Sequence, residues 1–296
     1  MFSVLIPTTG RMDLVEMALK SVLEQTFQDF EIVISDSGKN DQYGKILAAK
    51  DPRINYFNVK EEAGKQPFIT WESVTKRAKG KYILWLDDDN YLLPFALELF
   101  KKGIEESGAE IVTTNHLYYY DAKHPRHYLR NSLGIIPFTG KKLVFSPHDF
   151  LKSLLNFSER GPGKDLPRFH PSAIVVSKNI VDKAFERLGF VFMSDWPVNH
   201  AHHTILSTFA KSCFFIDRPA VIVGRLGVSM SQAWSLAAKS RFKKISFNPT
   251  HTPVTAYTKI NAILEHHLRI KEILPETFSD IEVNYNRFAE IGRAHV

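Results

Sequence analysis

The chain of 296 residues has a single cysteine, Cys213, and no long apolar run. One cysteine cannot form an intrachain disulfide, and it excludes a zinc site built from several thiolates. No segment approaches the roughly 20 apolar residues that a membrane-spanning helix needs. The apolar stretch at 2–6 is shorter than the core of a signal peptide, and no basic run precedes it. These absences favour a protein that acts in a reducing cytoplasm.

Motifs of several nucleotide-binding classes are also absent. No GxxxxGK[ST] segment occurs, which excludes a P-loop NTPase. The net charge of +6 is mild and no nucleic-acid-binding motif accompanies it, so we expect no nucleic-acid partner. One basic cluster stands out: Lys239, Arg241, Lys243 and Lys244. Peripheral contact with anionic lipid is one interpretation of this cluster, and an ordinary solvated helix face is the simpler one.

Apolar strands alternate with amphipathic helices over the first part of the chain. Five apolar segments predict strands: 2–6, 30–35, 54–58, 82–86 and 109–115. Four segments between them have helical periodicity: 13–25, 41–50, 66–79 and 94–107. Such a repeat with short connections predicts a parallel sheet covered by helices on both faces. Ligands bind such a sheet beyond the carboxyl ends of its strands.

Beyond residue 115 the pattern is less regular. Ser146-Pro147 predicts the first turn of a helix that runs through Asn156. The other expected elements are a strand at 173–177, helices at 178–188 and 196–210, strands at 214–216 and 220–223, and mostly helix from 230 onward.

Three consecutive aspartates, Asp87, Asp88 and Asp89, follow the fourth predicted strand directly. A solvated acidic turn is the plain interpretation, but carboxylates at the end of a core strand repel one another unless a cation neutralises them. Carboxylate oxygens suit Mg²⁺ or Mn²⁺, especially where substrate phosphates complete the shell. Asp36 follows the neighbouring second strand, either as a turn residue before Gly38 or as an acceptor for a base or ribose.

Several short stretches of the chain carry a recognisable pattern: SVLIPT at 3–8, ALKSVLEQTF at 18–27, DFEIV at 29–33, WE at 71–72, AKGKYI at 78–83 and LDDDN at 86–90. They resemble the opening and the DxD segment of family 2 glycosyltransferases, nearest to members with a triple aspartate. The resemblance implies the α/β GT-A fold, which is Rossmann-like, with a mostly parallel sheet and here a C-terminal helical extension. It also implies an inverting enzyme that moves a sugar from a nucleotide-sugar, in most members a UDP-sugar, to a hydroxyl acceptor.

The resemblance also implies roles for residues at the strand ends. Those that hold the nucleotide-sugar are Pro7, Thr8, Asp36, Asp87 and Asp88, with Asp88 at the ribose. Asp89 becomes the ligand of Mn²⁺ or Mg²⁺, with Asp87 close by. Thr9, Arg11 and Lys65 are further candidates at the donor, although exposed surface charges explain Arg11 and Lys65 equally well.

An inverting transfer needs a carboxylate that deprotonates the acceptor hydroxyl. In the family this is an aspartate, usually within a Glu-Asp pair that opens a helix, and the matching stretch here is FMSDW at 192–196. Asp195 is therefore the predicted base, while Ser194 departs from the family's glutamate. Asp195 also suits a helix N-cap, and the two roles are compatible. Trp196 is expected either to stack on an acceptor sugar or to pack in the core.

Histidines give weaker signals. The spacing of His200, His202 and His203 does not place all three on one helix face, so we expect partly exposed helix residues rather than metal ligands. The segment 224–231 resembles a late loop that often carries a histidine in the family, but Leu226 stands nearest to that position. Arg225 and Ser229 are the remaining candidates in this loop for binding phosphate.

The resemblance divides the chain into a nucleotide-sugar-binding half at 1–115, an acceptor-binding half at 116–229 and a helical extension at 230–289. Residues 290–296 reverse-translate to a common sequencing-adapter sequence, so we interpret them as a non-native tail. The expected acceptor is a saccharide or lipid-linked saccharide of bacterial surface-polysaccharide synthesis at the inner membrane face. The alternatives are a nucleotidyltransferase, whose glycine-rich basic loop is missing after the first strand, and an inactive nucleotide-sugar-binding protein.

Overall fold

The structure is a computed structural model, and it describes residues 1–60, 68–158, 167, 169–193, 198–227, 249–254 and 258–293. Several predicted residues lie outside this part of the chain: Lys65, Asp195, Trp196, Ser229 and the basic cluster at 239–244. The side chain of His200 is not described either. No helix in the described part of the chain is long and apolar enough to cross a membrane.

The described strands form one large sheet. They are β1 (Phe2–Thr8), β2 (Phe30–Asp36), β3 (Ile54–Asn58), β4 (Tyr82–Trp85), β5 (Tyr91–Leu92), β6 (Ile111–Tyr120), β7 (Ser132–Gly134), β8 (Lys142–Phe145), β9 (Ile174–Ser177) and β10 (Cys213–Arg225). Their order is β3-β2-β1-β4-β9-β6-β10-β5, with β7 beside β6 and β8 beside β10. The strands β3, β2, β1 and β4 are parallel, as predicted. The second half is mixed, because β9 enters antiparallel between β4 and β6.

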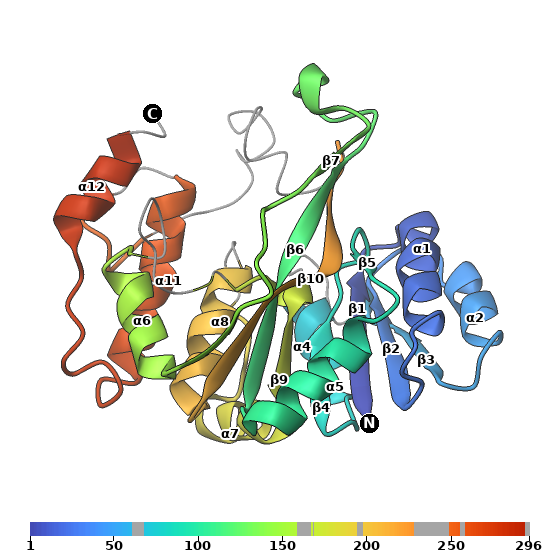
Figure 1. Cartoon of the computed structure of the whole chain (residues 1–296), viewed down its shortest axis with the longest axis horizontal. Coiled ribbons are helices and arrows are strands. Elements are labelled where there is room, and N and C mark those ends of the chain that lie inside the picture. Colours follow the sequence, from blue (N-terminus) through green and yellow to red (C-terminus); the bar gives the residue numbers. More distant parts are fainter. Residues whose placement is uncertain are drawn as a thin grey trace.

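Helices cover both faces of the sheet. The described α-helices are α1 (Met12–Leu23), α2 (Gln42–Ala48), α4 (Phe68–Lys76), α5 (Ala96–Ser107), α6 (Pro147–Leu155), α7 (Lys178–Leu188), α8 (Val198–Phe209), α11 (Lys259–Ile273) and α12 (Tyr285–Arg293). One buried cluster joins the sheet to α1, α2 and α5, and the other joins it to α4, α6, α7, α8 and α11. Figure 1 shows α6, α11 and α12 together at the end of the molecule opposite α1 and α2.

The parallel strands have continuous apolar sequences because both faces of the sheet are buried at these strands. All seven residues of β1 are buried, and successive side chains belong to different clusters, with Val4 and Ile6 on one face and Leu5 on the other. The predicted cap of α6 is confirmed, since Ser146 Oγ accepts a hydrogen bond from the His148 amide at 3.1 Å.

Two predictions beyond residue 115 need correction. The strands expected at 214–216 and 220–223 are one strand, β10, whose register shifts around Pro219. The expectation that His202 and His203 are partly exposed is wrong, because their side chains are 0% and 5% exposed. The His202 ring stacks on Phe192 at 4.3 Å between centroids. Helical spacing shows which residues share a face, but it does not show that the face is covered by the core.

Candidate functional site

The carboxyl ends of β2, β1 and β4 lie side by side and carry the predicted polar residues. Thr8 and Asp36 are register partners at the ends of β1 and β2. The amide of Leu86, directly before the aspartates, donates to the Leu5 carbonyl at 2.8 Å. The structure therefore brings Thr8, Asp36 and the aspartate triplet to one edge of the sheet, as strand-end positions predict. Pro7 is buried just before this edge and Thr9 is exposed just after it.

Asp88 is tied to the end of β1. Its side chain is 3% exposed, and its Oδ2 accepts hydrogen bonds from Thr8 Oγ1 at 2.6 Å and from Arg11 Nε at 3.0 Å. A second guanidinium nitrogen of Arg11 donates to Asp88 Oδ1, so the pair is bidentate. Burial raises the pKa of Asp88, and the charge of Arg11 opposes that shift. Arg11 is therefore part of this site and not an isolated surface charge.

Asp87 carries an unsatisfied carboxylate oxygen. Within the described part of the chain, its Oδ1 is buried without a hydrogen-bond partner, while Oδ2 accepts from Asn90 Nδ2 at 3.2 Å. Burial raises the pKa of Asp87 well above its ordinary value, and repulsion from Asp89 and Asp88 adds to the shift. A cation beside Asp87 would relieve both the repulsion and the missing contact.

The aspartates fit a divalent ion that substrate oxygens help to bind. In the described residues no three His, Cys, Asp or Glu side chains are grouped so as to hold a metal ion, and Asp88 is engaged with Thr8 and Arg11. Mg²⁺ commonly uses one or two carboxylates and completes its shell with substrate phosphates and water. Asp87 and Asp89 supply such a pair, and Asp89 Oδ2 lies 4.0 Å from the Arg11 guanidinium.

Residues 87–90 form a turn, closed by the Asn90 amide on the Asp87 carbonyl at 2.9 Å, which we call the aspartate turn. Residues from the second half of the chain support it. Ser172 Oγ accepts from the Asp87 amide at 3.2 Å and from Asn90 Nδ2 at 2.7 Å. Asn90 Oδ1 in turn accepts from the Gly224 amide at 3.0 Å. A Cβ atom on Gly224 would lie 2.1 Å from the Asp89 carbonyl oxygen, so only glycine fits there. Sequence reasoning missed the roles of Ser172 and Gly224 because nothing local marks a partner more than 80 positions away.

Asp36 occupies the turn role that was one of its two predicted interpretations. It is fully buried, and its oxygens accept from the Gly38 amide at 2.7 Å and from the Tyr56 hydroxyl at 2.8 Å. Burial and the Asp36 carboxylate raise the pKa of Tyr56. A Cβ atom on Gly38 would lie 2.6 Å from the Gly10 Cα, so this turn packs directly against the loop after β1. A nucleotide-binding role for Asp36 stays a prediction.

The late-loop residues are placed at the end of β10. Arg225 holds its guanidinium over the Tyr118 ring at 4.6 Å from the centroid, and Leu226 is buried. His170 caps the short 3-10 helix η2 (Pro171–Ala173), and its ring centroid lies 5.0 Å from that of His116. These residues lie on the β6 and β10 side of the aspartate turn, away from β1 and β2.

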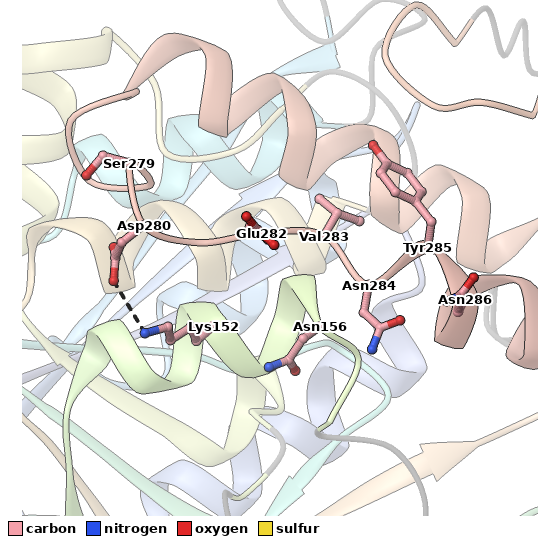
Figure 2. A pocket seen from close by; sticks show the side chains of 9 residues that line it. All are labelled: Lys152, Asn156, Ser279, Asp280, Glu282, Val283, Asn284, Tyr285 and Asn286. Atoms are coloured by element: carbon pink, nitrogen blue, oxygen red, sulfur yellow. Dashed lines mark hydrogen bonds and ion pairs between the residues drawn. The ribbon is translucent and has the colours of Figure 1, made fainter.

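A separate cavity of about 660 Å³ lies near the C-terminal helices. Figure 2 shows its wall, formed by α6 and by the segment that leads into α12, with Lys152 paired to Asp280 at 3.3 Å. None of the residues that line it belongs to the strand-end site.

The family model for glycosyl transferase family 2 matches residues 3–162, which is more than half of the chain. The chain belongs to glycosyl transferase family 2. It is 33% identical over 112 residues to a GalNAc(5)-diNAcBac-PP-undecaprenol beta-1,3-glucosyltransferase of Campylobacter jejuni, over 37% of this chain and 36% of that protein. It is 39% identical over 107 residues to an uncharacterized glycosyltransferase of Rickettsia conorii, over 36% of this chain and 17% of that protein. The chain thus spans less than half of either relative.

Solved structures share the fold. Staphylococcus aureus TarS 1–349 in complex with UDP-GlcNAc superposes with a TM-score of 0.57 at 14% identity, over 94% of this chain and 73% of that one. The mannosyltransferase PcManGT of Pyrobaculum calidifontis, in complex with GDP-Man and Mn²⁺, gives a TM-score of 0.50 at 17% identity, over 94% of this chain and 73% of that one. The predicted GT-A fold is therefore confirmed.

Proposed function

We propose that the protein is a metal-dependent, inverting glycosyltransferase that uses a nucleotide-sugar, in the first instance a UDP-sugar. The observation that carries this proposal is the aspartate turn at the end of β4, where a buried oxygen of Asp87 lacks a partner among the described residues and Asp89 adds a second carboxylate. Proteins with the same fold have been solved in complex with UDP-GlcNAc, and with GDP-Man and Mn²⁺. The relative from Campylobacter jejuni is named for an undecaprenol-linked saccharide. We infer a similar saccharide or lipid-linked acceptor, in bacterial surface-polysaccharide synthesis.

In the proposed mechanism each part of the site has one task. Asp87 and Asp89 would hold Mn²⁺ or Mg²⁺, which when bound stabilises the negative charge on the departing diphosphate. Thr8 and Arg11 hold both oxygens of the Asp88 carboxylate and so fix the residue that we place beside the ribose. Asp195 takes the proton from the acceptor hydroxyl as that oxygen attacks the anomeric carbon. The role of Asp195 rests on the sequence, because it lies outside the described residues.

The direct test is to screen UDP-, GDP- and dTDP-sugars against the purified chain. We expect one donor class to raise the Tm only when Mn²⁺ is present, and the same donor to release its nucleotide diphosphate on the enzyme. Asp195→Asn should keep the Tm shift and lose transfer. Donor binding without turnover under any condition would indicate an inactive binding protein. Formation of a nucleoside triphosphate and a sugar 1-phosphate, only when pyrophosphate is added to the donor, would indicate a nucleotidyltransferase.

Asp87→Asn should distinguish the stability that charge repulsion in the aspartate turn costs the protein from the turn's proposed role in binding metal and donor. Without metal, we expect the variant to have a higher Tm than wild type at neutral pH, because the change removes a buried charge that Asp89 and Asp88 repel. The Asn oxygen can still accept from Asn90, so the local hydrogen bond survives. With Mn²⁺ and donor, the wild type should gain more in Tm than the variant. A lower metal-free Tm in the variant would contradict the proposed repulsion.

A further inference from the structure

One face of β6 carries a row of rings, and a cation lies over one of them. His116, Tyr118 and Tyr120 alternate along the strand and so share a face. The ring centroids of His116 and Tyr118 are 4.8 Å apart, and those of Tyr118 and Tyr120 are 6.3 Å apart. His170 extends the row beyond His116, and Arg225 lies over Tyr118. We call these five residues the β6 aromatic strip.

The strip begins at the aspartate turn. Ser172 accepts from the Asp87 amide through its Oγ, and its own amide donates to His170 Nδ1 at 3.3 Å. On the other side, the Gly224 amide donates to Asn90, and Arg225 is the next residue along β10. Two independent hydrogen-bond paths therefore join the strip to the aspartate turn.

The strip lies on the side of the aspartates that faces away from the predicted nucleotide site. In the sheet order β2-β1-β4-β9-β6-β10, the ends of β2 and β1 precede the aspartate turn after β4, and β6 and β10 follow it. A donor whose nucleotide lies at β1 and β2, with its diphosphate at the aspartates, places its sugar toward β6. The acceptor must approach the anomeric carbon from the face opposite the leaving diphosphate, and the strip lies on that side.

Four side chains of the strip are partly exposed: Tyr118, whose ring also packs against the buried cluster, Tyr120, His170 and Arg225. His116 is buried. Within the described residues Arg225 has no carboxylate partner, and its guanidinium lies over the Tyr118 ring. A guanidinium held over an aromatic ring keeps its N–H donors directed outward. Aromatic rings beside unpaired donors are the usual lining of a site for a neutral polar ligand.

We propose that the β6 aromatic strip binds the acceptor saccharide. The C–H groups on one face of a pyranose form an apolar patch that packs on the rings of Tyr118 and Tyr120. Arg225 then donates hydrogen bonds to the sugar hydroxyls. This inference rests on the proposed function and adds to it the residues that select a pyranose acceptor.

The test compares two neighbouring tyrosines on opposite faces of the same strand. Tyr118→Leu removes the ring but keeps an apolar side chain, and Tyr119→Leu is the matched control because Tyr119 is 41% exposed on the other face. The probes are octyl glycosides of glucose, galactose and N-acetylglucosamine. Saturation-transfer NMR measures their binding without turnover. With the donor found in the screen, the acceptor KM is measured and UDP release without acceptor is the control.

We expect Tyr118→Leu to weaken glycoside binding and to raise the acceptor KM by about 3- to 10-fold. Its Mn²⁺-dependent donor Tm shift and its UDP release without acceptor should match wild type, and Tyr119→Leu should change nothing. Equal effects of both substitutions, no effect of Tyr118→Leu, or no glycoside binding by the wild type would overturn the proposal. Glycoside binding that depends on Tyr118, in a chain that turns over no donor, would instead refute the proposed function and leave the strip as a saccharide site.

Discussion

Asp89→Ala is expected to lower sugar transfer by at least about 10³-fold while leaving the fold intact, the scale seen when one preorganised charge-stabilising group is removed. The Asp89 side chain is 11% exposed and its Oδ2 is 4.0 Å from the Arg11 guanidinium. Its removal takes one of two carboxylates from the proposed metal site, so the diphosphate loses its counter-charge as the glycosyl bond breaks. The measurement is nucleotide release at saturating donor and Mn²⁺, together with the Tm.

Asp182→Ala is the matched control for this change. Asp182 is an exposed aspartate on α7 that pairs with Lys178 at 2.6 Å. Helix α7 begins after Ser177, which pairs with Tyr82 at the start of β4, whereas the aspartates follow the end of β4. Exposed pairs of this kind contribute little to stability, so activity and Tm should both stay near wild type. Transfer by Asp89→Ala at a tenth of the wild-type rate or more would show that the aspartate turn does not hold the metal.

The strand ends were predictable because their signals are local. A buried parallel strand reads as a short apolar run, and the polar residue that follows marks its carboxyl end, as Asp36 and Asp87 do here. The sheet rule then brings separate strand ends together without any knowledge of side-chain contacts. The aspartate turn and its neighbour at β2 therefore follow from pattern alone.

Contacts across long sequence distances were not predictable in the same way. The insertion of β9 between β4 and β6 depends on pairing between segments about 60 to 95 positions apart. The engagement of Asp88 by Arg11 and the support of Asn90 by Ser172 have no spacing signature either. The buried faces of His202 and His203 depend on what packs against α8, which helical periodicity cannot specify.

Glu72 makes one such long-range contact, and its contribution to stability can be measured. It lies on α4 and is 6% exposed, and its Oε1 accepts from the amides of Val191 and Phe192, both at 2.7 Å. Its Oε2 is buried and, among the described residues, has no hydrogen-bond partner. Phe192 also packs against Trp71 and Trp85. One carboxylate thus holds two consecutive backbone donors that come from more than 100 positions away.

Glu72→Ala is expected to lower the free energy of unfolding by about 2–6 kcal/mol, because each of two buried N–H groups loses its acceptor at about 1–3 kcal/mol. Urea denaturation followed by tryptophan fluorescence measures the change. Glu72→Gln is the control, since its amide oxygen can accept from both Val191 and Phe192 while the charge is removed. A loss in Glu72→Gln as large as that in Glu72→Ala would mean that the charge, and not the acceptor oxygen, stabilises the segment.

The pH dependence of Glu72→Gln adds a second, independent measurement. Burial raises the pKa of Glu72 in the folded protein, so folding favours the protonated carboxyl. The stability that this group contributes is complete below its unfolded pKa of about 4.3 and is lost as the pH rises through the raised folded pKa. Glutamine does not titrate. The free energy of unfolding of the variant should therefore rise relative to that of wild type across that pH range and stay higher at neutral pH. If the free energy of unfolding of wild type instead rose relative to that of the variant as the pH increased, the ionised carboxylate would be the stabilising form. The hydrogen bonds from the Val191 and Phe192 amides would then depend on the negative charge of Glu72. That charge would hold in place the backbone segment that precedes Asp195 in the sequence.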